Sequence, residues 1–309
     1  MRYAIIGTGA IGGYYGARLA EVGHEVHFLF HTEYDAVVKN GLQVNSVKGD
    51  IHLCKPFVYK SAASMPKCDV VIVAMKTTSE SLLMDMLPNV CADGCVVCLF
   101  QNGLGMEQIV YERLKDKIKG LTVCGGMAFI CASRVSPGVI AHYDFGSVTI
   151  SPLSSPEADF DKVKRICEDF NASNVKAIYD ENLNLRRWNK LLWNIPYNGM
   201  CVILNTSTDR LMQNPYSRNL IRDIMVEVTE GAAACGCPMA DDSVDNMMAY
   251  TDSMTPYAPS MKLDFDNHRA MEIEAIYTNP LNAAIANGCV MRKVQMMERQ
   301  LRFIQSQYL

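Results

Sequence analysis

A glycine-rich segment near the start of the chain, Gly7-Thr8-Gly9-Ala10-Ile11-Gly12, constrains the fold more than any other feature of the sequence. It follows the apolar run 2–6 and precedes a helical pattern from Tyr14 to Val22 that Gly23 closes. The apolar run from His24 to Phe30 comes next. This order of strand, glycine turn, helix and strand predicts a βαβ unit.

The spacing G-x-G-x-x-G in this context predicts a dinucleotide-binding turn. The first glycine permits the tight turn, the second lets the backbone approach a pyrophosphate, and the third lets helix and strand pack closely. The anion would lie at the N-terminus of the helix. The predicted cofactor-binding residues of the turn are therefore Gly7, Thr8, Gly9, Ala10, Ile11 and Gly12. A tight strand-to-helix turn without a ligand is the alternative.

The rest of the chain changes texture near Glu181. Before that point come the apolar or extended runs Asp69–Met75, Cys95–Phe100, Leu121–Ile130 and Val139–Ile150. After it, helical periodicity continues to the C-terminus. We therefore expect an α/β Rossmann domain with a doubly wound, mostly parallel sheet over residues 1–180, and an all-α substrate domain over residues 181–309.

The composition excludes several classes of protein. With 49% hydrophobic and 20% charged residues among 309, the chain is typical of a globular protein rather than a disordered or fibrous one. Its net charge of −4 offers no positive field for a phosphate backbone, so we expect no nucleic-acid partner. The uncharged stretch from Leu191 to Thr208 contains Asn194, Pro196 and Asn198, which disfavours a membrane span.

The twelve cysteines indicate a reducing compartment, and with no room for a secretory signal before the first strand we expect a cytoplasmic protein. Cys91, Cys95 and Cys98 have a spacing that zinc sites use. However, Cys95 and Cys98 would point to opposite faces of a buried strand. We therefore expect no metal site.

Strand ends in a doubly wound sheet face the ligand. At the end of the second strand, Phe30 and His31 stand where a carboxylate would select NAD, and His31 with Thr32 can donate hydrogen bonds to a 2′-phosphate. NADPH is therefore the favoured cofactor. Lys76 and Asn102 follow two later strands and should project towards it, with a surface lysine and a turn asparagine as the alternatives.

A polar ridge is expected on the first long helix of the second half. Lys190, Asn194 and Asn198 are four residues apart, so on a helix each is turned by only about 40° from the one before. Their neighbours are apolar, and buried polar groups need partners, which a substrate carboxylate or hydroxyl would supply. An exposed polar stripe is the alternative.

A lysine beside a nicotinamide has a chemical use. Its ammonium can stabilise the charge that grows on a carbonyl oxygen during hydride transfer and can deliver the proton, so Lys190 defines a carbonyl reductase. Glu272 and Glu274 lie in a predicted helical run from His268 to Tyr277 and face differently, so one can meet the substrate while the other stays in water. Ser260 stands at a predicted helix start, as an N-cap or a substrate donor.

In combination, these residues resemble the ketopantoate reductase (2-dehydropantoate 2-reductase) family over nearly the whole chain. The resemblance rests on their order: the glycine motif, Lys76, Gln101-Asn102-Gly103-Leu104-Gly105, Trp188-x-Lys190-x-x-x-Asn194-x-x-x-Asn198, Ser260 and Glu272. It implies NADPH-dependent reduction of ketopantoate to pantoate, in pantothenate and coenzyme A synthesis.

The resemblance also implies roles for individual residues. Lys190 would be the proton donor, and Glu272 would orient substrate and cofactor. Asn194, Asn198 and Ser260 would bind substrate, Asn102 would touch both ligands, and Lys76 would lie along the cofactor. His31 stands where the family usually has an arginine for the 2′-phosphate.

Two other functions fit the same residues. One is reduction of another branched 2-oxo acid, because the named residues recognise a 2-oxo acid with a nearby hydroxyl rather than ketopantoate alone. The other is a non-catalytic NADP(H)-binding sensor, against which Lys190 and Glu272 argue. The methionine-rich C-terminal helices are compatible with a homodimer.

Overall fold

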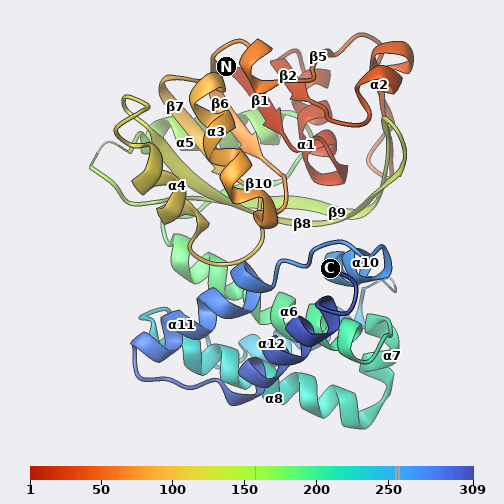
Figure 1. Ribbon diagram of the computed structural model, residues 1–309, viewed down its shortest axis with the longest axis vertical. Coiled ribbons are helices and arrows are strands. Elements are labelled where there is room, and N and C mark those ends of the chain that lie inside the picture. Colours follow the sequence, from red (N-terminus) through yellow and green to blue (C-terminus); the bar gives the residue numbers. More distant parts are fainter. Residues whose placement is uncertain (157, 255, 257) are drawn as a thin grey trace. The chain divides into compact units, whose positions relative to one another are not determined.

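The computed structural model describes residues 1–156, 158–254, 256 and 258–309. The chain forms two compact units, the first made of residues 1–101 and 106–183 and the second of residues 102–105 and 184–309. The sequence predicts a boundary at 180/181, whereas the short segment 102–105 also belongs to the second unit. Figure 1 labels the helices and strands of both units.

A ten-stranded sheet forms the first unit, in the order β4-β3-β9-β8-β7-β6-β1-β2-β5, with β10 beside β9. The strands are β1 (Arg2–Ile6), β2 (Glu25–Leu29), β3 (Leu42–Ser46), β4 (Ile51–Leu53), β5 (Phe57–Tyr59), β6 (Cys68–Val73), β7 (Cys91–Leu99), β8 (Thr122–Ser136), β9 (Val139–Pro152) and β10 (Ala177–Tyr179). The run from β5 to β8 is parallel throughout, and β8 and β9 form an antiparallel hairpin. The predicted mostly parallel sheet is confirmed.

Helices cover both faces of this sheet, as predicted. α1 and α5 pack on one face in the cluster that contains Cys98, and α3 and α4 pack on the other face in the cluster that contains Cys95. The two cysteines therefore do point to opposite faces of β7. The helices of the unit are α1 (Ala10–Glu21), α2 (Tyr34–Asn40), α3 (Glu80–Val90), α4 (Met106–Leu114) and α5 (Phe160–Ala172), with 3-10 turns at Ala62–Ser64 and Thr77–Ser79.

The first helix is longer than the sequence pattern indicated. α1 begins at Ala10 rather than at Tyr14. Gly12, Gly13 and Gly16 lie inside this helix and are buried where it packs on the sheet, although glycine is a poor helix former. A Cβ on Gly16 would lie 2.5 Å from the ring of Phe28 and 2.8 Å from Ile5. Close approach of helix and strand, rather than a turn, accounts for this glycine.

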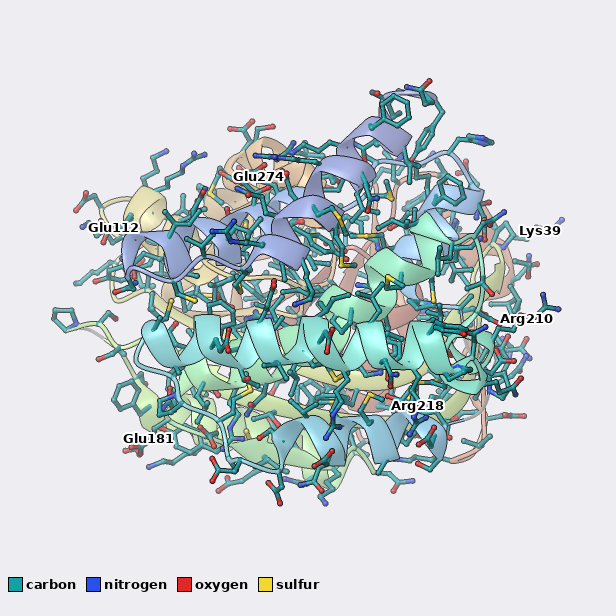
Figure 2. The ribbon with its side chains drawn as sticks, turned by 90° about the horizontal axis from the view of Figure 1, so that it is seen from below. Lys39, Glu112, Glu181, Arg210, Arg218 and Glu274 are labelled. Atoms are coloured by element: carbon teal, nitrogen blue, oxygen red, sulfur yellow. The ribbon has the colours of Figure 1, made fainter. Side chains whose placement is uncertain are left out.

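The second unit is helical, as predicted. Its elements are α6 (Leu183–Ile203), α7 (Thr208–Gln213), α8 (Pro215–Ala234), α9 (Ser243–Asp252), α10 (Ser260–Asp266), a π-helical turn (Glu274–Thr278), α11 (Asn279–Ala286) and α12 (Arg292–Gln305). Buried methionines, leucines and aromatic side chains from all of the longer helices form its core. Figure 2 shows α8 lengthwise, with Arg218 near one end, where it pairs with Asp252 of α9 at 2.7 Å.

Among the helices that the structure describes, none is long and apolar enough to cross a membrane. Within the same residues, no three histidine, cysteine, aspartate or glutamate side chains are grouped so that they could hold a metal ion. All twelve cysteines are unbridged.

Candidate functional site

The glycine turn between β1 and α1 has the geometry of a phosphate cradle. Gly7 has φ +92°, and a side chain there would overlap the backbone at Met75. At Gly12 a Cβ would overlap the Gly7 carbonyl, whereas at Gly9 it would meet no described atom within 4 Å. Gly9 therefore borders open space at the point where α1 begins, where the first N–H groups of a helix lack helical partners.

This turn fits a dinucleotide. Gly9 is the N-cap of α1 and carries no side chain to occupy the first N–H groups, so an anion can approach them directly. Thr8 donates a hydrogen bond to the Leu29 carbonyl at 2.8 Å, which ties the turn to the end of β2. The residues of the motif thus leave room for a pyrophosphate while the backbone around it is fixed.

The end of β2 presents donors rather than a carboxylate. His31 and Thr32 are exposed. Glu33 is buried, and its carboxylate accepts hydrogen bonds from Arg134 and from the Gly138 N–H, the latter at 2.9 Å. The first acidic side chain after the strand is therefore held by the β8–β9 hairpin. Arg134 lies 101 positions from Glu33, and no local pattern in the sequence indicates that the two meet.

Lys76 lies three residues after the end of β6 at Val73, where the sequence predicted a strand up to Met75. It is the N-cap of the 3-10 turn Thr77–Ser79, in an extended conformation, and is half-buried. Parallel strands β1 and β6 are neighbours, so the glycine turn after β1 and Lys76 after β6 emerge at the same edge of the sheet.

All of the predicted catalytic and substrate-binding residues lie in the helical unit. They are Asn102, Lys190, Asn194, Asn198, Ser260 and Glu272. Asn194 and Asn198 are 3% and 1% exposed, so the alternative of an exposed polar stripe is wrong for both, and Lys190 one turn earlier is half-buried. The Asn194 side-chain amide donates to Asn102 Oδ1 at 3.3 Å, which brings together two predicted site residues 92 positions apart.

Asn198 is unusual because its buried side chain is not satisfied. Neither its Nδ2 nor its Oδ1 makes a hydrogen bond within the part of the chain that the structure describes. Burying an unpaired amide costs about 1–3 kcal/mol per group in typical proteins. Burial also raises the pKa of the Cys201 thiol, on the same face of α6, to about 12, so this neighbour is neutral. A buried amide with two unsatisfied groups is chemically suited to a polar ligand.

Glu272 does not lie within a helix, contrary to the predicted helical run from His268 to Tyr277. His268 has φ +51°, and the backbone is non-helical up to Glu272, with the helical segment starting at Ile273. The cause is the end of α10, where the Arg269 N–H bonds to the Asp264 carbonyl at 2.9 Å and turns the chain away. Glu272 is 3% exposed in the resulting turn.

Glu274 faces away from Glu272, as predicted. Its side chain is 66% exposed and pairs with Arg302 of α12 at 2.7 Å, and Figure 2 labels it. Ser260 is the first residue of α10, so the predicted helix start is correct, but Pro259 occupies the N-cap position and the Ser260 hydroxyl is not a cap. A donor role for Ser260 is therefore compatible with the local structure.

Two family models together match most of the chain. The ketopantoate reductase family model, PanE/ApbA, matches residues 3–155, and the model of the family's C-terminal domain matches residues 182–305. A 2-dehydropantoate 2-reductase of Nostoc sp. is 41% identical over 306 residues, which span 98% of this chain and 95% of that protein.

Solved structures show the same fold. A 2-dehydropantoate 2-reductase from Geobacter metallireducens superposes with a TM-score of 0.92 at 34% identity, over 98% of this chain and 99% of that one. A D-mandelate dehydrogenase solved with NADH and anilino(oxo)acetate superposes with a TM-score of 0.85 at 20% identity, over 100% and 99% of the two chains. At that identity the second likeness shows the fold alone.

Proposed function

The chain belongs to the ketopantoate reductase family, and on that premise we propose that it reduces ketopantoate (2-dehydropantoate) to pantoate with NADPH, as a step of pantothenate and coenzyme A synthesis. One observation carries the proposal. Asn194, which holds Asn102, lies on the same ridge of α6 as the buried, unsatisfied amide of Asn198, in the unit that also contains Lys190 and Glu272.

The reaction needs a hydride at the C2 carbonyl carbon and a proton at its oxygen. The nicotinamide, when bound, supplies the hydride. Lys190 supplies the proton: its ammonium approaches the carbonyl oxygen, stabilises the negative charge that develops there, and protonates it to give the alcohol. The position of Lys190, half-buried and one turn before Asn194, supports this role because partial desolvation strengthens a charge–charge interaction.

The remaining residues hold the substrate. A side-chain amide donates through nitrogen and accepts through oxygen, so Asn198 can satisfy both a substrate carboxylate and a substrate hydroxyl. Ser260 adds a hydroxyl donor, and Asn102, fixed by Asn194, adds a second amide. Glu272 is a buried carboxylate that orients the ligands by accepting hydrogen bonds.

Two observations support NADPH over NADH. Glu33, the first carboxylate after β2, accepts hydrogen bonds from Arg134 and Gly138 and is not available to a ribose hydroxyl. His31 and Thr32 are exposed donors at the strand end.

The test is steady-state turnover with NADPH and NADH against ketopantoate and 2-oxoisovalerate, for the natural protein and for Lys190→Ala. The proposal expects ketopantoate with NADPH to be the best pair. Preference for another branched 2-oxo acid would move the substrate assignment within the same chemistry. Tight NADPH binding without hydride transfer to any 2-oxo acid would replace the reductase with a cofactor sensor.

A homodimer and a cytoplasmic location stay predictions. For the first, sedimentation equilibrium distinguishes the 34.4 kDa monomer from a particle of twice that mass.

A further inference from the structure

The helix after Glu272 begins with a π-helical turn, Glu274–Thr278, followed at once by Asn279-Pro280. In this turn the Asn279 N–H bonds to the Glu274 carbonyl, five residues back, instead of to the Ala275 carbonyl four residues back. Such turns are rare and cost regular hydrogen bonding. They are often found at functional sites, which prompts the question of what this one does.

The π-turn leaves the Ala275 carbonyl without a donor from its own helix. Its α-helical partner, the Asn279 N–H, is used by Glu274. Its π-helical partner would be residue 280, which is a proline and has no N–H. The Leu104 N–H takes the place of both and donates to the Ala275 carbonyl at 2.9 Å.

The carbonyl of Leu104 is held by Asn279, the residue that directly follows the π-turn. The Asn279 side-chain Nδ2 donates to the Leu104 carbonyl at 2.8 Å. Gly103 comes so close that a Cβ on it would lie 2.5 Å from the Ala275 carbonyl oxygen, and its φ of +103° suits glycine alone. Segment 102–105 is thus docked on the π-turn and on Asn279 through the N–H and the carbonyl of Leu104.

The docked segment carries Asn102, which reaches α6 through its bond with Asn194. The π-turn reaches the same helix independently, because the buried Tyr277 hydroxyl donates to the Ile195 carbonyl at 2.8 Å. Burial raises the pKa of Tyr277 well above its ordinary value, so it stays a protonated donor. Segment 102–105, the π-turn and α6 are therefore joined in a closed ring of hydrogen bonds, in which the Asn102–Asn194 bond is one link.

We propose that the π-turn and Asn279 are a positioning element for the reductase site: they fix Leu104 so that Asn102 stays against Asn194. The inference rests on the proposed function, in which Asn102 meets the ligands. Asn279 acts through Asn102 and is a positioning residue rather than a catalytic one. The Pro280 ring contributes by keeping the Ala275 carbonyl open to the loop.

The test replaces Asn279 by aspartate, which has nearly the same shape but cannot donate to the Leu104 carbonyl when ionised. The matched control is Asn287→Asp. Asn287 follows the same helix and its Nδ2 also donates to a backbone carbonyl, that of Ala283 at 2.8 Å, but this bond stays within α11. Asn279→Ala removes the donor without adding charge and guards against an effect of charge alone.

Two readouts are measured on the full-length protein. Native-state hydrogen exchange reports protection of the Leu104 amide, and steady-state kinetics reports kcat and KM for ketopantoate and NADPH. For Asn279→Asp and Asn279→Ala we expect Leu104 to exchange about tenfold faster or more, and kcat/KM for ketopantoate to fall about tenfold or more, because the half-buried donor to the Leu104 carbonyl is lost. Asn287→Asp, which removes only an exposed bond at the end of α11, should leave both close to the natural protein.

Three outcomes would overturn the inference. Faster Leu104 exchange with normal kcat/KM would mean that loop docking does not serve the reaction. Lower kcat/KM with unchanged exchange would mean that Asn279 acts by another route. An equal loss in Asn287→Asp would reduce the effect to helix stability. A natural protein without turnover on any 2-oxo acid rejects the proposed function, and the positioning role with it, while the exchange data still report whether the loop is docked.

Discussion

Asn198 offers a prediction in which stability and function move in opposite directions. Replacing Asn198 by leucine, which has a similar branched shape, removes two buried polar atoms that have no hydrogen-bond partner among the described residues. If the amide is kept for a ligand, the ligand-free protein should become more stable while substrate binding is lost. A purely structural asparagine would show the reverse.

The magnitude follows from the burial. Asn198 is 1% exposed, so each of its two unsatisfied groups carries close to a full desolvation penalty of about 1–3 kcal/mol. Removing this penalty stabilises the folded protein. Leucine is slightly larger than asparagine, however, and overpacking a buried site costs about 1–3 kcal/mol, which offsets part of the stabilisation. We expect a net increase of about 1 kcal/mol in the free energy of unfolding. That corresponds to a rise in Tm of about 1–2 °C, because the entropy of unfolding is about 2.1 cal/mol/K per residue and the chain has 309 residues.

The assay is scanning calorimetry of the ligand-free protein together with ketopantoate kinetics. Asn194→Leu is the matched control, because Asn194 lies one turn earlier on the same ridge but has a partner in Asn102 at 3.3 Å. Asn194→Leu should lower Tm, and both variants should raise KM for ketopantoate at least tenfold. A fall in Tm for Asn198→Leu equal to that of the control would refute the reasoning, since it would show that the Asn198 amide is satisfied in the ligand-free protein.

Three further predictions follow. Lys190→Ala should lower turnover by about 10²–10⁴-fold, the usual contribution of a positioned proton donor, with the Kd for NADPH unchanged in a fluorescence titration; near-normal turnover would remove Lys190 from the chemistry. Gly9→Ala should raise the Kd for NADPH with little change in Tm, because its Cβ meets only open space, whereas Gly12→Ala should lower Tm because its Cβ overlaps the Gly7 carbonyl; normal NADPH binding by Gly9→Ala would contradict the cradle. Burial lowers the pKa of His142 below its ordinary 6.5, so the folded protein favours the neutral imidazole. The contribution of His142 to stability is therefore complete above about pH 6.5 and is lost as the pH falls below it. In urea titrations between pH 7 and pH 5, His142→Gln should lose less stability than the natural protein, and an equal loss would count against this cause.

Local sequence patterns predicted much of the fold and of the candidate site. The glycine motif lies between strand and helix, as its spacing predicted: Gly7 and Gly12 lie too close to backbone atoms to carry a side chain, and Gly9 borders open space at the start of α1. The polar ridge of α6 followed from periodicity alone, since residues four apart share a helix face whatever the tertiary structure. The two buried asparagines confirm that this face is turned inward.

What escaped prediction depends on contacts distant in sequence. The pairing of Glu33 with Arg134 joins a strand end to a hairpin 101 positions later, and no period links them. The helix expected from His268 to Tyr277 fails in its first half because the end of α10 reverses the chain at His268, an effect of hydrogen bonds that apolar spacing does not encode. The place of segment 102–105 in the helical unit is set by a carbonyl that Pro280 leaves open, which only the assembled structure reveals.

The most direct test of the proposed reductase activity is the loss of NADPH absorbance with ketopantoate. The same assay is run with NADH in place of NADPH and with 2-oxoisovalerate in place of ketopantoate. We expect ketopantoate with NADPH to give by far the highest kcat/KM of the four combinations. Saturable NADPH binding with no oxidation by either 2-oxo acid would contradict it, because the Lys190 ridge would then have no carbonyl to reduce.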